Sequence, residues 1–256
     1  MNEARTDSFG LNGFTLVELL TVTAVIGLLA ALLLPAVNRA KVKTKTQRAR
    51  LEMGQIVAAI TEYESTYNRF PVSRDATRVA EMSNEDITYG GVLEETHTWL
   101  AGPGYFTNNC EIMAVLLDIE YYGDGSPTIN QGHVRNPQRT KFIDATQVGG
   151  TNAVPGIGID GIYRDPWGSP YLITLDLNRD GRARDIMYRE PAVSADPTAP
   201  QRGLCGLTRG VDNLGKPVFE FPGSVMVWSA GPDRHVSIKQ RADEGVNRDN
   251  VLSWTP

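Results

Sequence analysis

The stretch Gly13-Phe14-Thr15-Leu16-Val17-Glu18-Leu19-Leu20 opens an apolar run that continues to Pro35 and Val37 and carries Glu18 as its only charge. A hydrocarbon core about 30 Å thick needs about 20 apolar residues in a helix, so this run can span a membrane. A carboxylate inside lipid costs about 2–3 kcal/mol or more, which marks it as a functional position unless it lies near enough to the helix end to reach water. Charge alone leaves both alternatives open.

The residues around Glu18 resemble the prepilin processing site of type IV pilins and of the pseudopilins of type II secretion. The resemblance implies that a prepilin peptidase cuts after Gly13, that the new N-terminal Phe14 is methylated, and that Glu18 serves in assembly. Pro35, late in the apolar run, fits the same pattern. Glu18 of one subunit would pair with the free amine of Phe14 in a neighbour, so the cost of a charge in lipid favours assembled subunits.

Composition argues against several other classes of function. The 256 residues carry a net charge of −5, which argues against a nucleic-acid-binding surface over the whole protein. No G-x-S-x-G, Walker, dinucleotide or H-E-x-x-H motif occurs, and His97, His133 and His235 are scattered among expected loops, so we expect no enzymatic activity. Cys110 and Cys205 could form a disulfide in an oxidising compartment or remain unpaired.

The segment before the apolar run is expected to be a leader, residues 1–13. A secretory signal peptide is cut after its apolar run, whereas this candidate cut precedes the run, so the helix stays in the mature protein. The resemblance implies a single-pass protein of the inner membrane with its C-terminal domain in the periplasm.

The charges that follow the apolar run favour the opposite orientation. Six cations precede the next acid, and the positive-inside rule would place the C-terminal body in the cytoplasm. We follow the processing motif, because a peptidase site is more specific than a charge count. These cations could contact lipid head groups or acidic faces of neighbouring subunits, or form an ordinary solvated helix face. They are Arg39, Lys41, Lys43, Lys45, Arg48 and Arg50.

Helical sequence continues beyond Pro35 to about Tyr67, with good helix formers and apolar residues at spacings of three, four and seven. Pro35 should kink this helix rather than end it, and Phe70-Pro71 should lie beyond its end. We therefore predict a leader over 1–13, a transmembrane and spine helix over 14–67 and a globular domain over 68–256. The face expected to be buried consists of Val42, Ala49, Met53, Ile56, Val57 and Ile60.

One turn in the globular part is informative: Asp165-Pro166-Trp167-Gly168-Ser169-Pro170-Tyr171. Proline and glycine favour a tight turn, the two aromatic residues can anchor it, and a strand is expected over 171–175. The turn resembles a signature of the major pseudopilin of type II secretion, in which it opens the C-terminal sheet. The same resemblance implies a later strand over 225–228. Apolar residues on one face predict a helix over 111–122. Compared with that family, residues 72–160 and 189–220 look like insertions.

Two acidic loops are candidates for calcium. The segment 176–185 has oxygens at positions one, three and five and glycine at six, as at the start of a calcium loop, with Asp176, Asn178, Asp180 and Asp185 as candidate ligands. The glutamate expected at position twelve is absent and three arginines weaken the field, so a polar hairpin turn between strands 171–175 and 186–188 is the alternative. By resemblance to the major pseudopilin, the competing loop spans 233–249, with Asp233, Asp243 and Asp249.

Together these features predict an α+β protein, with one long N-terminal helix packed on a small C-terminal antiparallel sheet that carries loop insertions. The expected function is that of a prepilin-like subunit of a type II secretion pseudopilus for protein export. Its expected partners are a prepilin peptidase, other pilin-like subunits in a homopolymer, the inner-membrane assembly platform and the membrane, with no nucleic acid. The alternatives are a type IV pilin for adhesion, motility or DNA uptake, and a membrane-tethered binding domain. Calcium is the one candidate cofactor.

Overall fold

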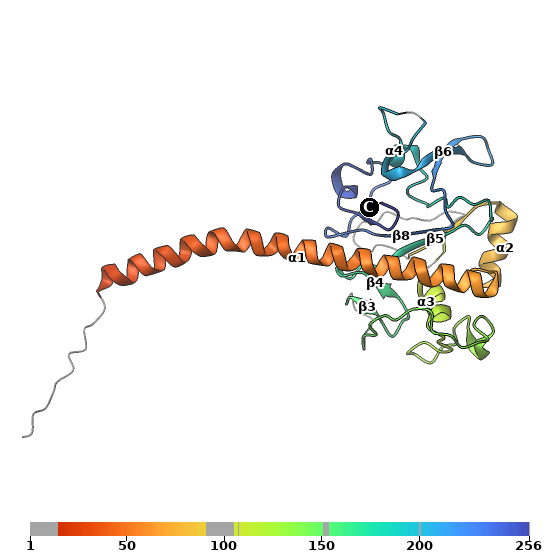
Figure 1. Cartoon of the computed structure of the whole chain (residues 1–256), viewed down its shortest axis with the longest axis horizontal. Helices are drawn as coiled ribbons and strands as arrows, with labels where there is room; N and C mark the ends of the chain where they lie inside the picture. Colours follow the sequence, from red (N-terminus) through yellow and green to blue (C-terminus); the bar gives the residue numbers. More distant parts are fainter. Residues whose placement is uncertain (1–14, 91–104, 107, 151–153, 200, 256) are drawn as a thin grey trace, which may run out of the picture. The chain divides into compact units, whose positions relative to one another are not determined.

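A computed structural model describes residues 15–90, 105–106, 108–150, 154–199 and 201–255. The expected processing residues Gly13 and Phe14 lie outside these ranges, as does His97. The chain divides into two units, Met1–Thr44 and Lys45–Pro256, and helix α1 (Leu16–Tyr67) runs through the boundary between them (Figure 1).

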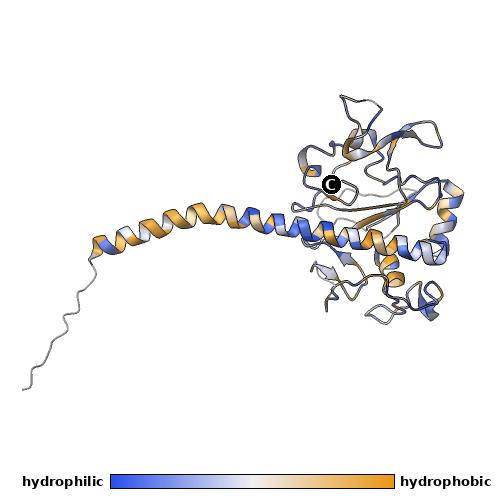
Figure 2. Cartoon of the chain, viewed as in Figure 1, coloured by the Kyte–Doolittle hydropathy of each residue, from blue (hydrophilic) through white to orange (hydrophobic). Residues whose placement is uncertain are grey.

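In the residues that the structure describes, the first unit consists of the part of α1 up to Thr44, which is apolar as far as Val37. Its large apolar side chains are exposed, and the helix is long and apolar enough to cross a membrane. Figure 2 shows hydrophobic colouring along this part of α1, followed by a hydrophilic stretch. Pro35 lies inside the helix, which continues past it. Helical sequence on both sides explains the continuity, because a proline removes only one hydrogen bond of the helical ladder.

In the second unit, the remaining part of α1 buries one face in the core. Ala49, Met53, Ile56 and Ile60 of the predicted face are buried, and Val57 packs against the same core. Val42 was predicted on this face, but it belongs to the first unit and is 43% exposed. The spacing of three and four residues continues from Ile60 to Tyr63, which is also buried and was not in the prediction.

Five strands form the main sheet in the order β2-β1-β5-β8-β9. β5 pairs antiparallel with β1 and β8, and β9 pairs antiparallel with β8, so the predicted antiparallel arrangement is confirmed for these four strands. β2 pairs in parallel with β1. The bounds are β1 (Ile87–Tyr89), β2 (Tyr105–Phe106), β5 (Leu172–Leu175), β8 (Val225–Ser229) and β9 (Val251–Leu252).

Both faces of this sheet are covered, because successive side chains of β5 and β8 enter two different hydrophobic clusters. Ile173 and Val227 pack with α1 and α3 (Cys110–Leu116), whereas Leu172 and Trp228 pack in the second cluster. This is the period-two alternation of a strand buried on both sides. The α+β fold class is therefore confirmed.

The segment 72–160 contributes to the central architecture, although it was interpreted as an insertion. It supplies α2 (Arg74–Ser83), α3 and strands β1 and β2. α3 ends at Leu116, whereas the sequence predicted a helix to Tyr122. The cause is a Schellman-type end: Asp118 has a φ of 58°, and the Ile119 N–H donates to the Ala114 carbonyl over 2.8 Å.

The segment 189–220 forms α4 (Pro191–Ser194), β6 (Thr208–Val211) and β7 (Pro217–Glu220), and Val193 of α4 and Phe219 of β7 belong to the second cluster. The strand predicted over 186–188 is instead a turn, because the Asp185 carboxylate accepts the Met187 and Tyr188 N–H groups and folds the chain back. The remaining short elements are η1 (Gln131–His133), β3 (Gly156–Ile157), β4 (Tyr163–Arg164), η2 (Leu204–Gly206) and η3 (Gly245–Asn247).

Candidate functional site

Glu18 lies in the first turn of α1 and takes part in a capping box with Thr15. The Thr15 N–H and hydroxyl donate to Glu18 Oε2 over 2.8 and 2.7 Å, and the Glu18 N–H donates to Thr15 Oγ1 over 3.2 Å. A threonine followed three residues later by glutamate satisfies helix N–H groups in this reciprocal way. The carboxylate therefore already has a local structural role at the helix start.

The capping box uses only one oxygen of Glu18. Both bonds from Thr15 reach Oε2, and no donor among the described residues bonds to Oε1. The side chain is exposed. Glu18 can therefore cap its own helix and still accept a hydrogen bond from a second group, such as an amine.

The turn from Asp165 to Tyr171 closes on the Asp165 carboxylate. Asp165 Oδ1 accepts the Trp167 and Ser169 N–H groups, each over 2.9 Å, and the Ser229 hydroxyl of β8 donates to Oδ2 over 2.5 Å. Gly168 has a φ of 94°, which the turn requires and glycine adopts without strain. Burial, partly opposed by these hydrogen bonds, raises the pKa of Asp165 to about 6.

Pro170 and Tyr171 lead the chain from this turn into β5, and Tyr171 links the turn to α1. The fully buried Tyr171 hydroxyl donates to Glu52 Oε2 over 2.6 Å, and Arg48 Nε lies 2.8 Å from Glu52 Oε1. Burial and then the Glu52 charge raise the pKa of Tyr171. The ordinary alternative, a turn with buried aromatic anchors, thus describes what the turn does within the fold.

Two buried polar residues that support this turn were not predicted from the sequence. The side-chain amide of Asn109 donates to the carbonyls of Tyr163 and Tyr171, and its oxygen accepts the Tyr163 N–H. Glu52 is the other; as an acid on the predicted apolar face of α1, it could have been singled out. Asn109 carried no comparable signal, because its partners lie more than 50 residues away in the chain.

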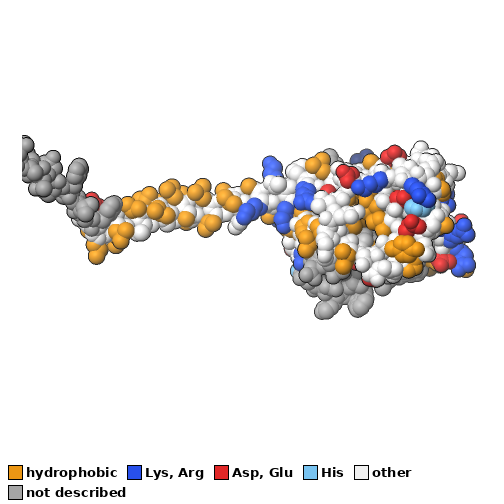
Figure 3. All heavy atoms as spheres, turned by 90° about the horizontal axis from the view of Figure 1, so that it is seen from below, with side chains coloured by type: hydrophobic (Ala, Val, Ile, Leu, Met, Phe, Trp, Pro, Cys, Tyr) orange, Lys and Arg blue, Asp and Glu red, His pale blue; other side chains and the backbone are white. Residues whose placement is uncertain are grey.

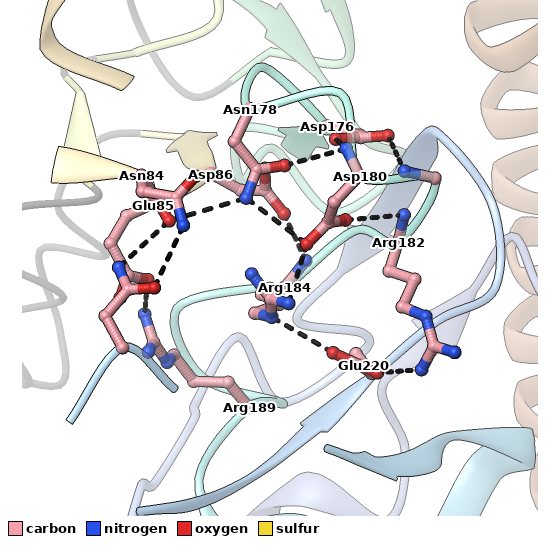
Figure 4. A network of polar contacts seen from close by, with 12 residues as sticks. Asn84, Glu85, Asp86, Asp176, Asn178, Asp180, Arg182, Arg184, Arg189 and Glu220 are labelled. Carbon is pink, nitrogen blue, oxygen red and sulfur yellow. Dashed lines mark hydrogen bonds and ion pairs between the residues drawn. The ribbon is translucent and has the colours of Figure 1, made fainter. Parts of the chain in front are cut away.

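Three of the four candidate ligands of the first calcium loop, Asp176, Asn178 and Asp180, lie near one another, but their oxygens are bonded to groups of the protein itself (Figure 4). Asp176 accepts the Asp180 and Gly181 N–H groups, and Asp180 Oδ2 lies 2.7 Å from an Arg184 nitrogen. Asp185 is fully buried elsewhere, where it accepts from Thr174 and the Trp228 indole. The loop is a polar turn as in the alternative interpretation, although it leads into the turn at 186–188 and not into a strand.

The second candidate loop brings two of its three acids close together. Asp249 Oδ2 accepts the Asp233 N–H over 3.3 Å, whereas Asp243 lies 2.7 Å from an Arg241 nitrogen. Burial, followed by the Asp233 charge, raises the pKa of Asp249. Among the described residues, no group of three or more His, Cys, Asp or Glu is arranged to hold a metal ion. Neither loop offers a fitting set of ligands, and calcium stays a prediction.

The cysteines and histidines also have local environments. Cys110 and Cys205 are both unpaired and half-buried. His133 lies between two acids, with Nδ1 2.8 Å from Asp118 and Nε2 3.1 Å from Glu120. The His235 backbone N–H donates to Asp233 Oδ1 over 2.8 Å, and its ring nitrogen Nδ1 contacts the Asp233 carbonyl. These positions fit packing or surface roles.

Comparison with known proteins points to one group. Over 73 residues, or 28% of this chain, the sequence is 35% identical to two type IV major pilin proteins PilE1 of Neisseria gonorrhoeae, of which it covers 44% and 41%. The chain thus spans less than half the length of these curated relatives. No protein-family profile and no solved structure matches. The similarity supports a type IV pilin-like chain and does not distinguish a pilus subunit from a pseudopilus subunit.

Proposed function

We propose that this protein is a membrane-anchored, pilin-like subunit that polymerises after a prepilin peptidase cuts behind Gly13 and methylates Phe14. The observation that carries the proposal is the exposed apolar part of α1, which begins at the Thr15–Glu18 capping box. The sequence similarity to type IV major pilins supports it.

The physical argument starts from the apolar surface of α1. Each square ångström of apolar surface removed from water contributes about 25 cal/mol, so a bare helix of this kind needs lipid or other helices around it. The bilayer covers the helix before assembly, and neighbouring copies of α1 cover it in a fibre. The helix thus supports both a membrane-bound and a polymerised state.

Glu18 supplies the specific contact in this scheme. Cleavage after Gly13 frees an amine at Phe14, and the unused Oε1 of Glu18 is available to an amine of a neighbouring subunit. A charge that is costly in lipid is compensated when this pair forms, so assembly is favoured over the isolated subunit.

The experiment that tests the proposal is mass spectrometry of the protein isolated from its membrane. We expect an N-terminal peptide that begins with a methylated Phe14. A chain that retains residues 1–13 when prepilin peptidase is present would contradict the proposal.

For the role of the fibre, we propose a type II secretion pseudopilus in the inner membrane, with the globular domain in the periplasm and contacts to the assembly platform. The Asp165–Tyr171 turn, which resembles the major pseudopilin signature, supports this choice. The second candidate is a type IV pilus subunit, which is favoured by the names of the curated relatives. Deleting the gene separates them: a pseudopilin mutant should retain exoproteins in the cell, whereas a pilin mutant should lose surface fibres and still secrete.

We propose a structural rather than a catalytic role for the globular domain. The contacts of Asp165, Tyr171 and Asp185 are internal and stabilise the fold. A membrane-tethered binding domain is the remaining alternative. For such a domain, Glu18→Ala should leave function intact, because the domain would need α1 only as an anchor.

A further inference from the structure

The first three of the six cations that follow the apolar run of α1 form what we call the collar: Arg39, Lys41 and Lys43. All three are exposed, and none has an ion pair with any residue that the structure describes. No acid occurs between Glu18 and Glu52, so this part of the helix carries positive charge only. Figure 3 shows Lys and Arg side chains directly after the hydrophobic part of the helix.

The helical register places the collar on more than one side of α1. At about 100° per residue, Lys43 lies about 40° from Arg39, whereas Lys41 lies about 200° from it. A single flat protein partner would meet one side of the helix. A bilayer surface surrounds a helix that crosses it, so cations on opposite sides can all reach that surface.

The position of the collar along α1 also agrees with the thickness of a bilayer. At 1.5 Å per residue, the rise from Leu16 to Arg39 is about 35 Å, slightly more than a hydrocarbon core of about 30 Å. When the start of α1 lies at one edge of the core, Arg39 reaches the head groups at the other edge. Lys and Arg side chains can extend along the helix and bring Lys41 and Lys43 to the same layer.

We propose that the collar binds the anionic head groups of phospholipids and thereby fixes the depth of α1 in the bilayer. This inference rests on the proposed function, since it requires α1 to be in the membrane. Clusters of Lys and Arg directly beside a membrane helix attract anionic lipid, and the attraction falls off within a Debye length. The collar would hold the subunit at one depth until assembly withdraws it.

The test uses the full chain, diluted from detergent into vesicles and floated on a density gradient. One set of vesicles contains phosphatidylcholine alone, and the other contains phosphatidylcholine mixed with phosphatidylglycerol. We expect flotation with both, and a partition into the anionic vesicles that is higher by about fivefold for each cation near the surface. Added salt should reduce this preference.

Matched variants test whether the collar causes the preference for anionic vesicles. R39Q/K41Q/K43Q should float with neutral vesicles as the wild type does, but lose most of the preference for anionic ones. The control variant R139Q/K141Q/K216Q removes three exposed cations from the second unit and should retain the preference for anionic vesicles. K41R/K43R retains the charge and should also keep it.

Two outcomes would overturn the proposal while the membrane anchor stands: equal partition of the wild type into both vesicles, or an unchanged preference in the collar variant. If the collar variant instead loses salt-sensitive cross-linking between copies and keeps its lipid preference, the collar is a contact between subunits. If the wild type floats with neither vesicle, the anchor fails, and the proposed function fails with it.

Discussion

Single residues decide how α1 is attached to the rest of the second unit, and Tyr171 is the most direct case. Tyr171→Phe removes a hydroxyl that donates to the Glu52 carboxylate over 2.6 Å and leaves Glu52 with Arg48 as its charged partner. Hydrogen bonds to charged groups contribute about 1.5–3 kcal/mol. We expect the free energy of unfolding to fall by about that amount, as measured by chemical denaturation of the full chain in detergent.

The matched control for this prediction is Tyr121→Phe. Tyr121 is 52% exposed, and its hydroxyl accepts from the Gln131 side-chain amide at the surface. Its loss should change stability by less than about 0.5 kcal/mol. Equal effects of the two substitutions would show that the buried bond to Glu52 contributes nothing specific.

Asp86 makes stability depend on pH. Its side chain is buried, Oδ2 accepts the Arg184 N–H over 2.7 Å, and Oδ1 has no partner among the described residues (Figure 4). The pKa of Asp86 is raised to about 7, and burial is the largest cause. The charges of Asp176 and Asp180 also raise this pKa, whereas the hydrogen bond from the Arg184 N–H and the Arg184 charge oppose the rise. The folded state therefore holds a proton that the unfolded state releases at lower pH.

The direction of this pH dependence follows from proton linkage between the folded and unfolded states. The contribution of Asp86 is most favourable below its unfolded pKa near 3.8 and is lost as the pH rises through about 7. Asp86→Asn cannot ionise and still offers an oxygen to the Arg184 N–H. Its melting temperature should match or fall below that of the wild type at pH 4 and exceed it at pH 8, by the equivalent of a few kcal/mol at most. Asp144→Asn, at a side chain that is 98% exposed, should show no such crossover; a crossover there as well would remove Asp86 as the cause.

At the scale of elements, α1 changes its surroundings along its length. Ile56 is fully buried against the sheet, whereas Leu51, also in the second unit, is 71% exposed. Ile56→Ala should destabilise the protein by about 2–5 kcal/mol, because it removes apolar contacts and leaves a cavity. Leu51→Ala should change stability by about 0.5 kcal/mol or less in thermal unfolding of the full chain. A similar loss for both would mean that α1 does not pack on the sheet through the face described.

The sequence predicted the elements whose signals are local. The periodicity of α1 located Ala49, Met53, Ile56 and Ile60 in the core. The strand that follows the Asp165–Tyr171 turn was expected and is β5, and the strand expected from the resemblance to the major pseudopilin is β8. The sequence did not predict that β1 pairs with β5. A strand of three residues is too short to show a pattern of its own and is identified only by the strand with which it pairs. The role of Asn109 was likewise not predicted, because the carbonyls that its side chain binds lie more than 50 residues away in the chain.

The candidate site shows the same limit. Asp185 was placed with Asp176 because the two lie nine residues apart in one acidic segment, but in the structure Asp185 accepts a hydrogen bond from the Trp228 indole. Spacing along the chain could not reveal this, since the contact joins residues 43 positions apart. Glu18 was identified from its charge in an apolar helix, whereas its capping bond to Thr15 became visible in the structure.

At the scale of the whole molecule, the second unit buries its core and α1 leaves an apolar surface exposed in the first unit. An exposed apolar surface of this kind is typical of a membrane-interaction or protein-interaction site. In the assembly that we propose, Glu18 caps its own helix with Oε2 and offers Oε1 to an amine of a neighbouring subunit.

The most direct measurement is the assembly of Glu18 variants in cells that assemble the wild-type chain, followed by cross-linking between subunits and by pelleting of fibres. Glu18→Gln keeps an oxygen that can accept the Thr15 N–H but lacks the charge, and Glu18→Ala lacks both. We expect both variants to insert in the membrane and neither to form cross-linked polymers. Polymers of Glu18→Gln as abundant as those of the wild type would contradict this expectation, because the charge would then have no role in assembly.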